Sequence, residues 1–283
     1  MSSGFLLLAQ NSEYDYVTQA SVCAMSIKAN MPDASVSLVT NDTVPDKYQE
    51  LFDNIIPIPW SEDKQTSDKM SVTERWKLYH STPYEQTIVL DTDMLVLQDI
   101  SSWWKFLENY DLFYVSNVLT YRDKTVTSNY YRKTFTSNSL PNLYSGFHYF
   151  KKCDFAHDFY KWLELIVNNW ELFYGQYAKE NYPKTCSMDV SAAIAAKILN
   201  CENEITNSSV KYPSFTHMKP YIQEWQYPQA RWQNKVGVYL TSDLKLTIGN
   251  HLQQGIFHYT EKDFLTEDII ERYERALGIN NDS

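Results

Sequence analysis

The sequence predicts one α/β domain built on a mostly parallel sheet. The first indication is a strand–helix–strand rhythm at the start of the chain, with extended apolar runs at 5–10 and 35–40 on either side of a helical pattern at 16–30. The second is the lack of any repeat, low-complexity tract or linker in the 283 residues. Two strands joined by a helix pair in parallel through a right-handed crossover, so the opening segment already favours a parallel sheet.

The other elements of the first half follow from apolar spacing and turn residues. Val17, Ala20, Ala24 and Ile27 recur at helical spacing, and this helix should end before Pro32. Further strands are expected at 52–59, 86–90, 94–97 and 112–118, and a helix at 73–80.

The second half begins with a polar stretch. Residues 121–140 have few periodic apolar positions, which predicts a long loop or lid with some helix, a kind of segment that is often functional. The later elements, in chain order, should be a strand at 146–151, helices at 156–174 and 189–199, an irregular aromatic segment at 215–232, strands at 244–248 and 254–259, and a helix at 267–277.

Composition limits the partners. The formal net charge of −10 argues against broad binding to nucleic acid or anionic membranes, which requires a basic surface. An acidic protein that binds a diphosphate must supply positive charge locally, for example with a divalent cation and lysines. The 22 Tyr and 8 Trp suit sugars, because each offers an apolar face and a polar tip, although a Tyr-rich core explains them more simply.

Cysteine usage and the N-terminus favour a cytoplasmic location. The four cysteines are far apart and include no Cys-x-x-Cys, so neither a zinc site nor a disulfide framework is expected. The first apolar run lacks a basic segment before it and reads as a buried strand rather than a signal peptide. No run approaches the roughly 20 apolar residues of a membrane span.

The sharpest motif is Asp91-Thr92-Asp93, directly after the apolar run Ile88-Val89-Leu90. Ligands of open α/β sheets bind outside the carboxyl ends of the strands. Two carboxylates at this position can hold one hard cation, which in turn can bridge a diphosphate. The tripeptide alone is a weak signal, and a solvated strand end would look the same, but this is the only Asp-x-Asp in the chain.

Around this motif the sequence resembles glycosyltransferase family 8, which has the GT-A fold. The resemblance is carried by Arg75-Trp76-Lys77-Leu78, by Pro83-Tyr84 and by the strand ending in Asp91-Thr92-Asp93. It implies a mixed, mostly parallel sheet with helices on both faces. It also implies a metal-dependent, retaining transferase that uses Mn2+ or Mg2+ and a nucleoside diphosphate sugar, usually of uridine. Asp91 and Asp93 would bind the metal, and Lys77 and Thr92 would lie near the donor.

Two other segments resemble the same family. Leu8-Ala9-Gln10-Asn11, followed by Tyr16, is similar to the strand exit that binds the nucleoside, which implies donor contacts for Ala9, Asn11 and Tyr16. The stretch 255–262 is similar to the late strand that supplies a third metal ligand, here His258, and a lysine for the diphosphate, here Lys262. His251 is the alternative histidine.

The middle of the chain matches less well. Leu143-Tyr144-Ser145-Gly146-Phe147 resembles a strand entry where Gly146 approaches the donor sugar, but Tyr144 replaces an Asn. Ser187-Met188-Asp189-Val190 resembles a helix entry whose Asp189 would bind donor hydroxyls in a catalytic role, but Val190 replaces a Gln. The Val190 difference puts retention of configuration in doubt, and Asp189 could equally be a helix cap.

The acceptor, a carbohydrate or another hydroxyl compound, is expected against the aromatic segment, with His217, Lys219, Trp225 and Tyr227 as candidates. Core packing would explain these aromatic residues equally well. Within one domain, 1–283, residues up to about 120 would bind the donor, 121–265 would face the acceptor, and 266–280 would form the C-terminal helix. One alternative is a nucleotide-sugar or carbohydrate-binding protein without turnover. Another is a nucleotidyltransferase, but that class normally needs a Gly-rich loop and the chain has only 7 Gly.

Overall fold

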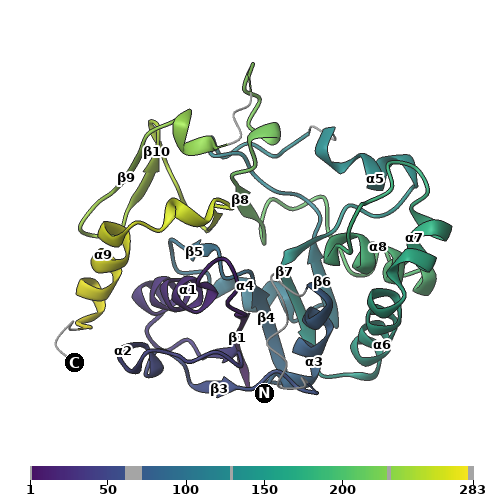
Figure 1. The fold of residues 1–283 in the computed structure, drawn as a ribbon, viewed down its shortest axis with the longest axis horizontal. Coiled ribbons are helices and arrows are strands. Elements are labelled where there is room, and N and C mark those ends of the chain that lie inside the picture. Colours follow the sequence, from purple (N-terminus) through teal and green to yellow (C-terminus); the bar gives the residue numbers. More distant parts are fainter. Residues whose placement is uncertain (1, 61–71, 128–129, 228–230, 280–283) are drawn as a thin grey trace.

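The computed structural model describes residues 2–60, 72–127, 130–227 and 231–279 (Figure 1). Its centre is a six-stranded sheet in which the first four strands are parallel and the last two pairs are antiparallel. In spatial order the strands are β3 (Asn54–Ile56), β2 (Val36–Val39), β1 (Ser3–Leu8), β4 (Gln86–Leu90), β7 (Tyr144–Lys151) and β6 (Leu112–Val115).

Helices cover both faces of this sheet, which confirms the predicted fold class (Figure 1). Phe5 and Leu7 pack on the side of α1 (Tyr16–Asn30), whereas Leu6 packs on the side of α6 (Asp154–Asn168) and α8 (Met188–Leu199). Because both faces are covered, β1 and β4 read as continuous apolar runs rather than alternating ones. Asp15 caps α1, its side chain accepting a hydrogen bond from the backbone N–H of Thr18 at 2.9 Å.

Two small three-stranded sheets lie beside the main one. The first has the order β5 (Met94–Val96), β12 (Ile256–His258), β8 (Phe215–His217), and the second the order β11 (His251–Leu252), β10 (Leu246–Ile248), β9 (Val238–Leu240). The expectation that 215–232 is irregular is therefore wrong at its start. A strand of three residues gives almost no periodic signal, and β8 forms because it pairs in parallel with the distant β12.

The remaining helices refine the expected boundaries. The helix expected at 156–174 is divided at Asn169 into α6 and α7, and the helix expected at 73–80 is a 3-10 turn followed by one α-helical turn. Short helices at 46–49 and 102–107 were not expected. The bounds are α2 (Asp46–Gln49), η1 (Val72–Lys77), α3 (Leu78–Ser81), α4 (Ser102–Leu107), η2 (Tyr130–Arg132), α5 (Lys133–Ser137), α7 (Trp170–Tyr177), η3 (Pro220–Ile222), η4 (Trp232–Asn234), η5 (Lys262–Phe264) and α9 (Glu267–Leu277).

Across the described ranges, none of the helices is both long enough and apolar enough to cross a bilayer. The C-terminal helix ends at Leu277, with Gly278 in the left-handed conformation, and residue 280 of the expected helix lies outside the described residues. The expectation of a cytoplasmic location stays a prediction.

The close packing of β1 against the turn before β4 yields a stability prediction. A Cβ atom on Gly4 would overlap the ring of Tyr84, whose hydroxyl is held by Ser37 Oγ at 2.7 Å. We expect Gly4→Ala to lower the free energy of unfolding by about 1–3 kcal/mol, measured by urea denaturation. The control is Gly175→Ala in α7, where a Cβ atom meets nothing within 4 Å; it should raise stability by about 0.5–1 kcal/mol. Equal effects of the two substitutions would contradict this packing.

Candidate active site

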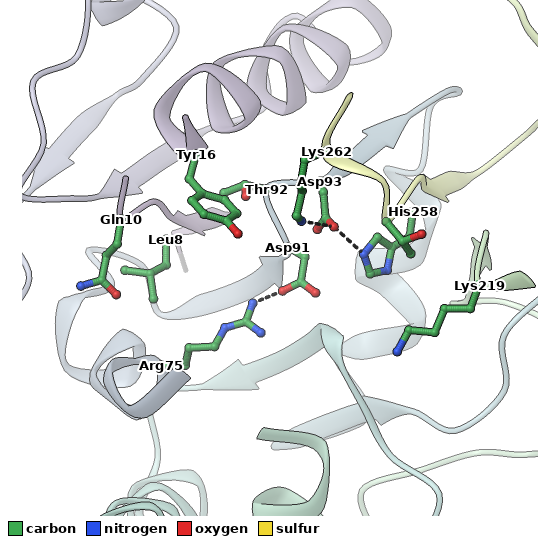
Figure 2. Close-up of a pocket in the computed structure, with 11 residues that line it drawn as sticks. Leu8, Gln10, Tyr16, Arg75, Asp91, Thr92, Asp93, Lys219, His258 and Lys262 are labelled. Atoms are coloured by element: carbon green, nitrogen blue, oxygen red, sulfur yellow. Dashed lines mark hydrogen bonds and ion pairs between the residues drawn. The ribbon is translucent and has the colours of Figure 1, made fainter. Parts of the chain in front are cut away.

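A cleft opens where β1 and β4 reach their carboxyl ends (Figure 2). This is the edge of an α/β sheet at which ligands bind. The residues that line the cleft are Leu8, Gln10, Tyr16, Arg75, Asp91, Thr92, Asp93, Lys219, His258, Thr260 and Lys262. They come from segments as far apart in the chain as Leu8 and Lys262.

The Asp-x-Asp motif and the late histidine meet in this cleft. Strand β12 pairs antiparallel with β5, so that His258 is the register partner of Met94, the residue directly after Asp93. His258 Nε2 lies 3.0 Å from Asp93 Oδ2. One ligand atom each from Asp91, Asp93 and His258 lies within 4.8 Å of the others, so the three can hold one metal ion.

Asp93 is the electrostatic centre of the group. Its side chain is buried, and Lys262 Nζ lies 2.6 Å from the same oxygen that His258 contacts. Burial by itself would raise the pKa of Asp93, but the charges and hydrogen bonds of His258 and Lys262 outweigh it and hold that pKa well below its usual range. Asp93 is therefore an anion ready to accept a cation.

Asp91 is placed by the neighbouring strand β7. Its backbone N–H donates to the carbonyl of Gly146 at 2.9 Å, and its carboxylate forms an ion pair with Arg75. A Cβ atom at position 146 would come within 2.8 Å of Asp91 Oδ2 and 2.9 Å of Met94 Cε. Gly146 thus leaves the space that the Asp91 carboxylate needs, which is a structural reason for glycine at this position.

Of the three residues inferred to contact the nucleoside, one lines the cleft and two do not. Tyr16 lines the cleft, but the side chains that accompany it are Leu8 and Gln10 rather than Ala9 and Asn11 (Figure 2). Successive side chains of an extended segment point to opposite faces, so Ala9 and Asn11 do not share the face of Leu8 and Gln10. Ala9 is buried, and the Asn11 side chain instead accepts a hydrogen bond from the backbone N–H of Val17 at 3.0 Å.

Lys77 lies outside the cleft, and Arg75 lines it instead. Lys77 pairs with Glu74 and lines a separate pocket together with Trp76 and His80. In a 3-10 helix two positions correspond to about two thirds of a turn, so Arg75 and Lys77 face different sides. The family resemblance allows either Arg75 or Lys77 to be the basic residue near the donor. Which of the two faces the cleft depends on the direction of η1.

The acceptor candidates are dispersed. Lys219 lines the cleft, and the His217 ring is buried and stacked on that of His258 at 4.7 Å between centroids. The ring of Trp225 packs against that of Tyr121, with 6.0 Å between centroids, and Tyr227 is exposed. Neither residue lines the cleft. Residues 228–230 of the same segment lie outside the described residues.

His251, the alternative to His258, lies in β11 with its ring edge against Tyr121. Strand β11 belongs to the other small sheet, so His251 is not part of the group formed with Asp91 and Asp93.

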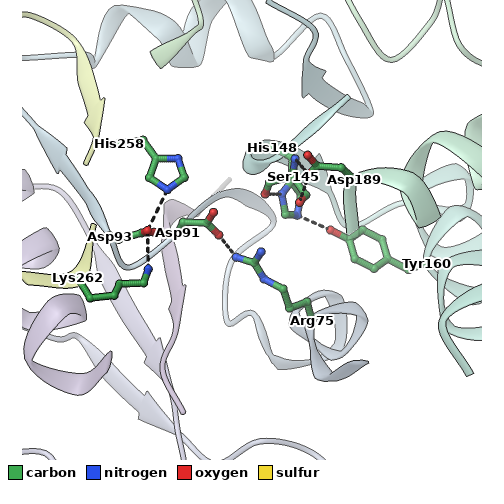
Figure 3. Close-up of polar contacts among 9 residues, drawn as sticks. All are labelled: Arg75, Asp91, Asp93, Ser145, His148, Tyr160, Asp189, His258 and Lys262. Carbon is green, nitrogen blue, oxygen red and sulfur yellow. Dashed lines mark hydrogen bonds and ion pairs between the residues drawn. The ribbon is translucent and has the colours of Figure 1, made fainter. Parts of the chain in front are cut away.

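Asp189 is held in a network of its own (Figure 3). Its Oδ1 accepts hydrogen bonds from the Ser145 N–H at 2.8 Å and the Ser145 hydroxyl at 2.6 Å, and its Oδ2 lies 2.6 Å from Arg132. Burial opposes ionisation, but Arg132 and the Ser145 donors lower the pKa of Asp189 below its ordinary value. Arg132, which sequence reasoning missed, is buried beside the Tyr144 ring at 4.1 Å.

Comparison with known proteins identifies the architecture. No family model matches the chain, and no curated protein matches it in sequence. Among solved structures, the galactosyltransferase LgtC in complex with donor and acceptor sugar analogues is similar with a TM-score of 0.54 at 14% identity, covering 99% of this chain and 97% of LgtC. The chain has a GT-A fold.

A second solved structure, the apo form of the bifunctional glycosyltransferase WbbM, is similar with a TM-score of 0.52 at 11% identity. That match covers 99% of this chain and 50% of WbbM, so the chain spans half the length of the bifunctional protein. At these identities the likeness concerns the fold. The family 8 resemblance, the metal and the roles of individual residues remain inferences from the site.

The Asp189 network leads to a prediction about stability. Asp189→Asn leaves the buried Arg132 guanidinium without its counter-charge and should lower the free energy of unfolding by about 3 kcal/mol at pH 7. Since the pKa of Asp189 is lowered in the folded protein, the unfolded chain takes up the proton first, so this stabilisation is complete above about pH 3.9 and lost below it. The difference between the urea midpoints of wild type and variant should stay constant from about pH 7 to about pH 4 and shrink as the pH falls further, to about pH 2.

The matched control for this experiment is Asp158→Asn, whose carboxylate is exposed and 3.7 Å from Lys161. It should change stability by less than about 0.5 kcal/mol at either pH. A constant difference between wild type and Asp189→Asn at all pH values would contradict the ionised pair.

Proposed function

We propose that the protein is a metal-dependent glycosyltransferase that moves a sugar from a nucleoside diphosphate sugar, with uridine as the nucleoside, to a hydroxyl of a carbohydrate or related acceptor. The observation that carries the proposal is the convergence of Asp91, Asp93 and His258 at the carboxyl end of β4 in a GT-A fold. Lys262 beside this group supplies the local positive charge that an acidic protein needs to bind a diphosphate.

The donor set fits a divalent cation. Two carboxylates and one imidazole suit Mn2+, and Mg2+ would be held less well because it prefers oxygen ligands. When bound, the ion would neutralise charge on the departing diphosphate. Gly146 keeps the Asp91 carboxylate free of a clash in the position from which it would bind the ion.

The protein groups around the cation site would bind and orient the donor. The nucleoside would lie by Leu8, Gln10 and Tyr16, and Arg75 and Lys262 would contact the phosphates once the cation neutralises their carboxylate partners. Lysine and arginine placed where charge develops stabilise the transition state.

Asp189 would bind the donor sugar and is poorly suited to act as a nucleophile. Both of its carboxylate oxygens are already hydrogen-bonded, to Ser145 and to Arg132. For a retaining transfer, this arrangement favours an acceptor that approaches on the face that the diphosphate leaves over a covalent intermediate on Asp189.

A binding protein without turnover is the second candidate. The observation that favours it is Val190, an apolar, buried residue at the position where the resemblance implies a Gln. Metal-dependent release of nucleoside diphosphate from a donor distinguishes the two, since a binding protein releases none.

The first test is a thermal-shift titration with a panel of nucleoside diphosphates and their sugars, with and without Mn2+. We expect metal-dependent stabilisation by one nucleotide, with the shift growing as the ligand exceeds its dissociation constant. Asp93→Ala should lose this increment, because it removes a metal ligand, whereas Asp158→Ala on the surface of α6 should keep it. The absence of any shift in wild type would exclude the transferase.

A second test separates Arg75 from Lys77. Arg75→Gln should lower kcat/KM for the donor by about tenfold to a hundredfold, because it removes a cation from the cleft. Lys77→Gln, which alters a residue facing the other pocket, should lower it less than about threefold. Initial rates of nucleoside diphosphate release measure both effects, and the reverse order would show that Lys77, and not Arg75, contacts the donor.

A further inference from the structure

Lys219 is a cleft-lining cation without a carboxylate partner. Arg75 forms an ion pair with Asp91, and Lys262 with Asp93, but within the described ranges no acidic group lies within 4 Å of Lys219 Nζ. The contact found for its ammonium is the ring of Tyr131, 5.5 Å from the centroid.

The acidic groups near Lys219 are already paired with other cations, which leaves its ammonium available. The two carboxylates that act electrostatically on Lys219 are those of Asp189 and Asp93. Each already forms an ion pair with another cation, Asp189 with Arg132 and Asp93 with Lys262. Desolvation by the surrounding protein lowers the pKa of Lys219, as expected for an ammonium that lacks a counter-charge. Lys219 is nevertheless an exposed residue that lines the cleft, so its unpaired ammonium is accessible to a ligand that enters there.

The charge balance of the proposed complex leaves Lys219 unused. A divalent cation would neutralise Asp91 and Asp93, which frees Arg75 and Lys262 to face the donor. A nucleoside diphosphate sugar carries one negative charge on each phosphate, and these two cations match them. The positive charge that remains is that of Lys219.

The position of Lys219 points to the acceptor. Leu8, Gln10 and Tyr16 lie at one end of the cleft, the metal-binding group lies in the middle, and Lys219 lies at the other end, beyond His258 (Figure 2). Lys219 is carried there by β8, which pairs with β12 and places His217 beside His258.

We propose that the acceptor carries an anionic group, a phosphate or a carboxylate, and that Lys219 binds it. This inference rests on the proposed function and names the substrate class of the same site. A point-like ammonium suits either anion.

The binding test uses the protein saturated with Mn2+ and with the nucleoside diphosphate that stabilises it. Inorganic phosphate or glucuronate should raise the melting temperature further, and glucose should not. Lys219→Met should lose this additional shift, Lys219→Arg should keep it, and Lys161→Met on exposed α6 should match wild type. No anion-dependent shift in wild type, or an equal shift in Lys219→Met, would overturn the proposal.

The turnover test uses acceptors that differ in one anionic group: methyl glucoside against methyl glucuronide, and glycerol against glycerol 3-phosphate. Wild type should prefer the anionic member, and Lys219→Met should reduce this preference about tenfold, the contribution of one hydrogen bond to a charged group. The two pairs also distinguish carboxylate from phosphate. Equal slowing with both members would mean that Lys219 serves the leaving group, which overturns the proposal.

The two proposals fail in different ways. If nucleotide and Mn2+ give no stabilisation of wild type, the transferase is excluded. If they do stabilise it but neither test depends on Lys219, the transferase stands and the anionic acceptor does not. If the protein transfers sugar to none of these acceptors, the melting-temperature shifts with phosphate and glucuronate decide whether Lys219 binds an anion.

Discussion

The pairing of β12 with β5 is the constraint on which the site depends. Strand β5 begins at Met94, directly after the Asp-x-Asp motif, and its antiparallel register with β12 places His258 against that position. The same pairing delivers Lys262 to Asp93 and, through the parallel partner β8, positions Lys219 at the far end of the cleft. A one-residue slip would turn His258 to the opposite face, so the backbone ladder fixes the ligand set.

The charges of the cleft are organised around this ladder. Asp93 is buried yet ionised, because His258 and Lys262 outweigh the cost of its desolvation. Asp91 is balanced in the same way by Arg75. In the absence of a bound ion, the basic groups of the cleft neutralise the two carboxylates that a divalent cation would bind. Under the proposed function, binding of an ion would release these basic groups toward the donor.

Much of the fold could be predicted because its signals are local. Helix α1 and strand β4 occur at the residues where apolar spacing placed them.

Only part of the site could be predicted from the sequence. Asp91 and Asp93 follow a buried strand, whereas the choice of Arg75 over Lys77 depends on the direction of a 3-10 turn. Arg132 lies in a polar stretch, and its partner Asp189 is 57 positions away, so no local pattern connects them.

The separation of the site's parts along the chain affects how the protein is made. Lys262 and Asp93 are 169 positions apart, and His258 belongs to the last strand. All six strands of the central sheet have been synthesised once β7 is made, but the cation group stays open until β12 pairs with β5. On a ribosome, where folding proceeds from the N-terminus, the first strands can therefore assemble without forming a competent centre. A chain terminated before β12 would keep Asp91 and Asp93 but lack His258 and Lys262, which complete their group.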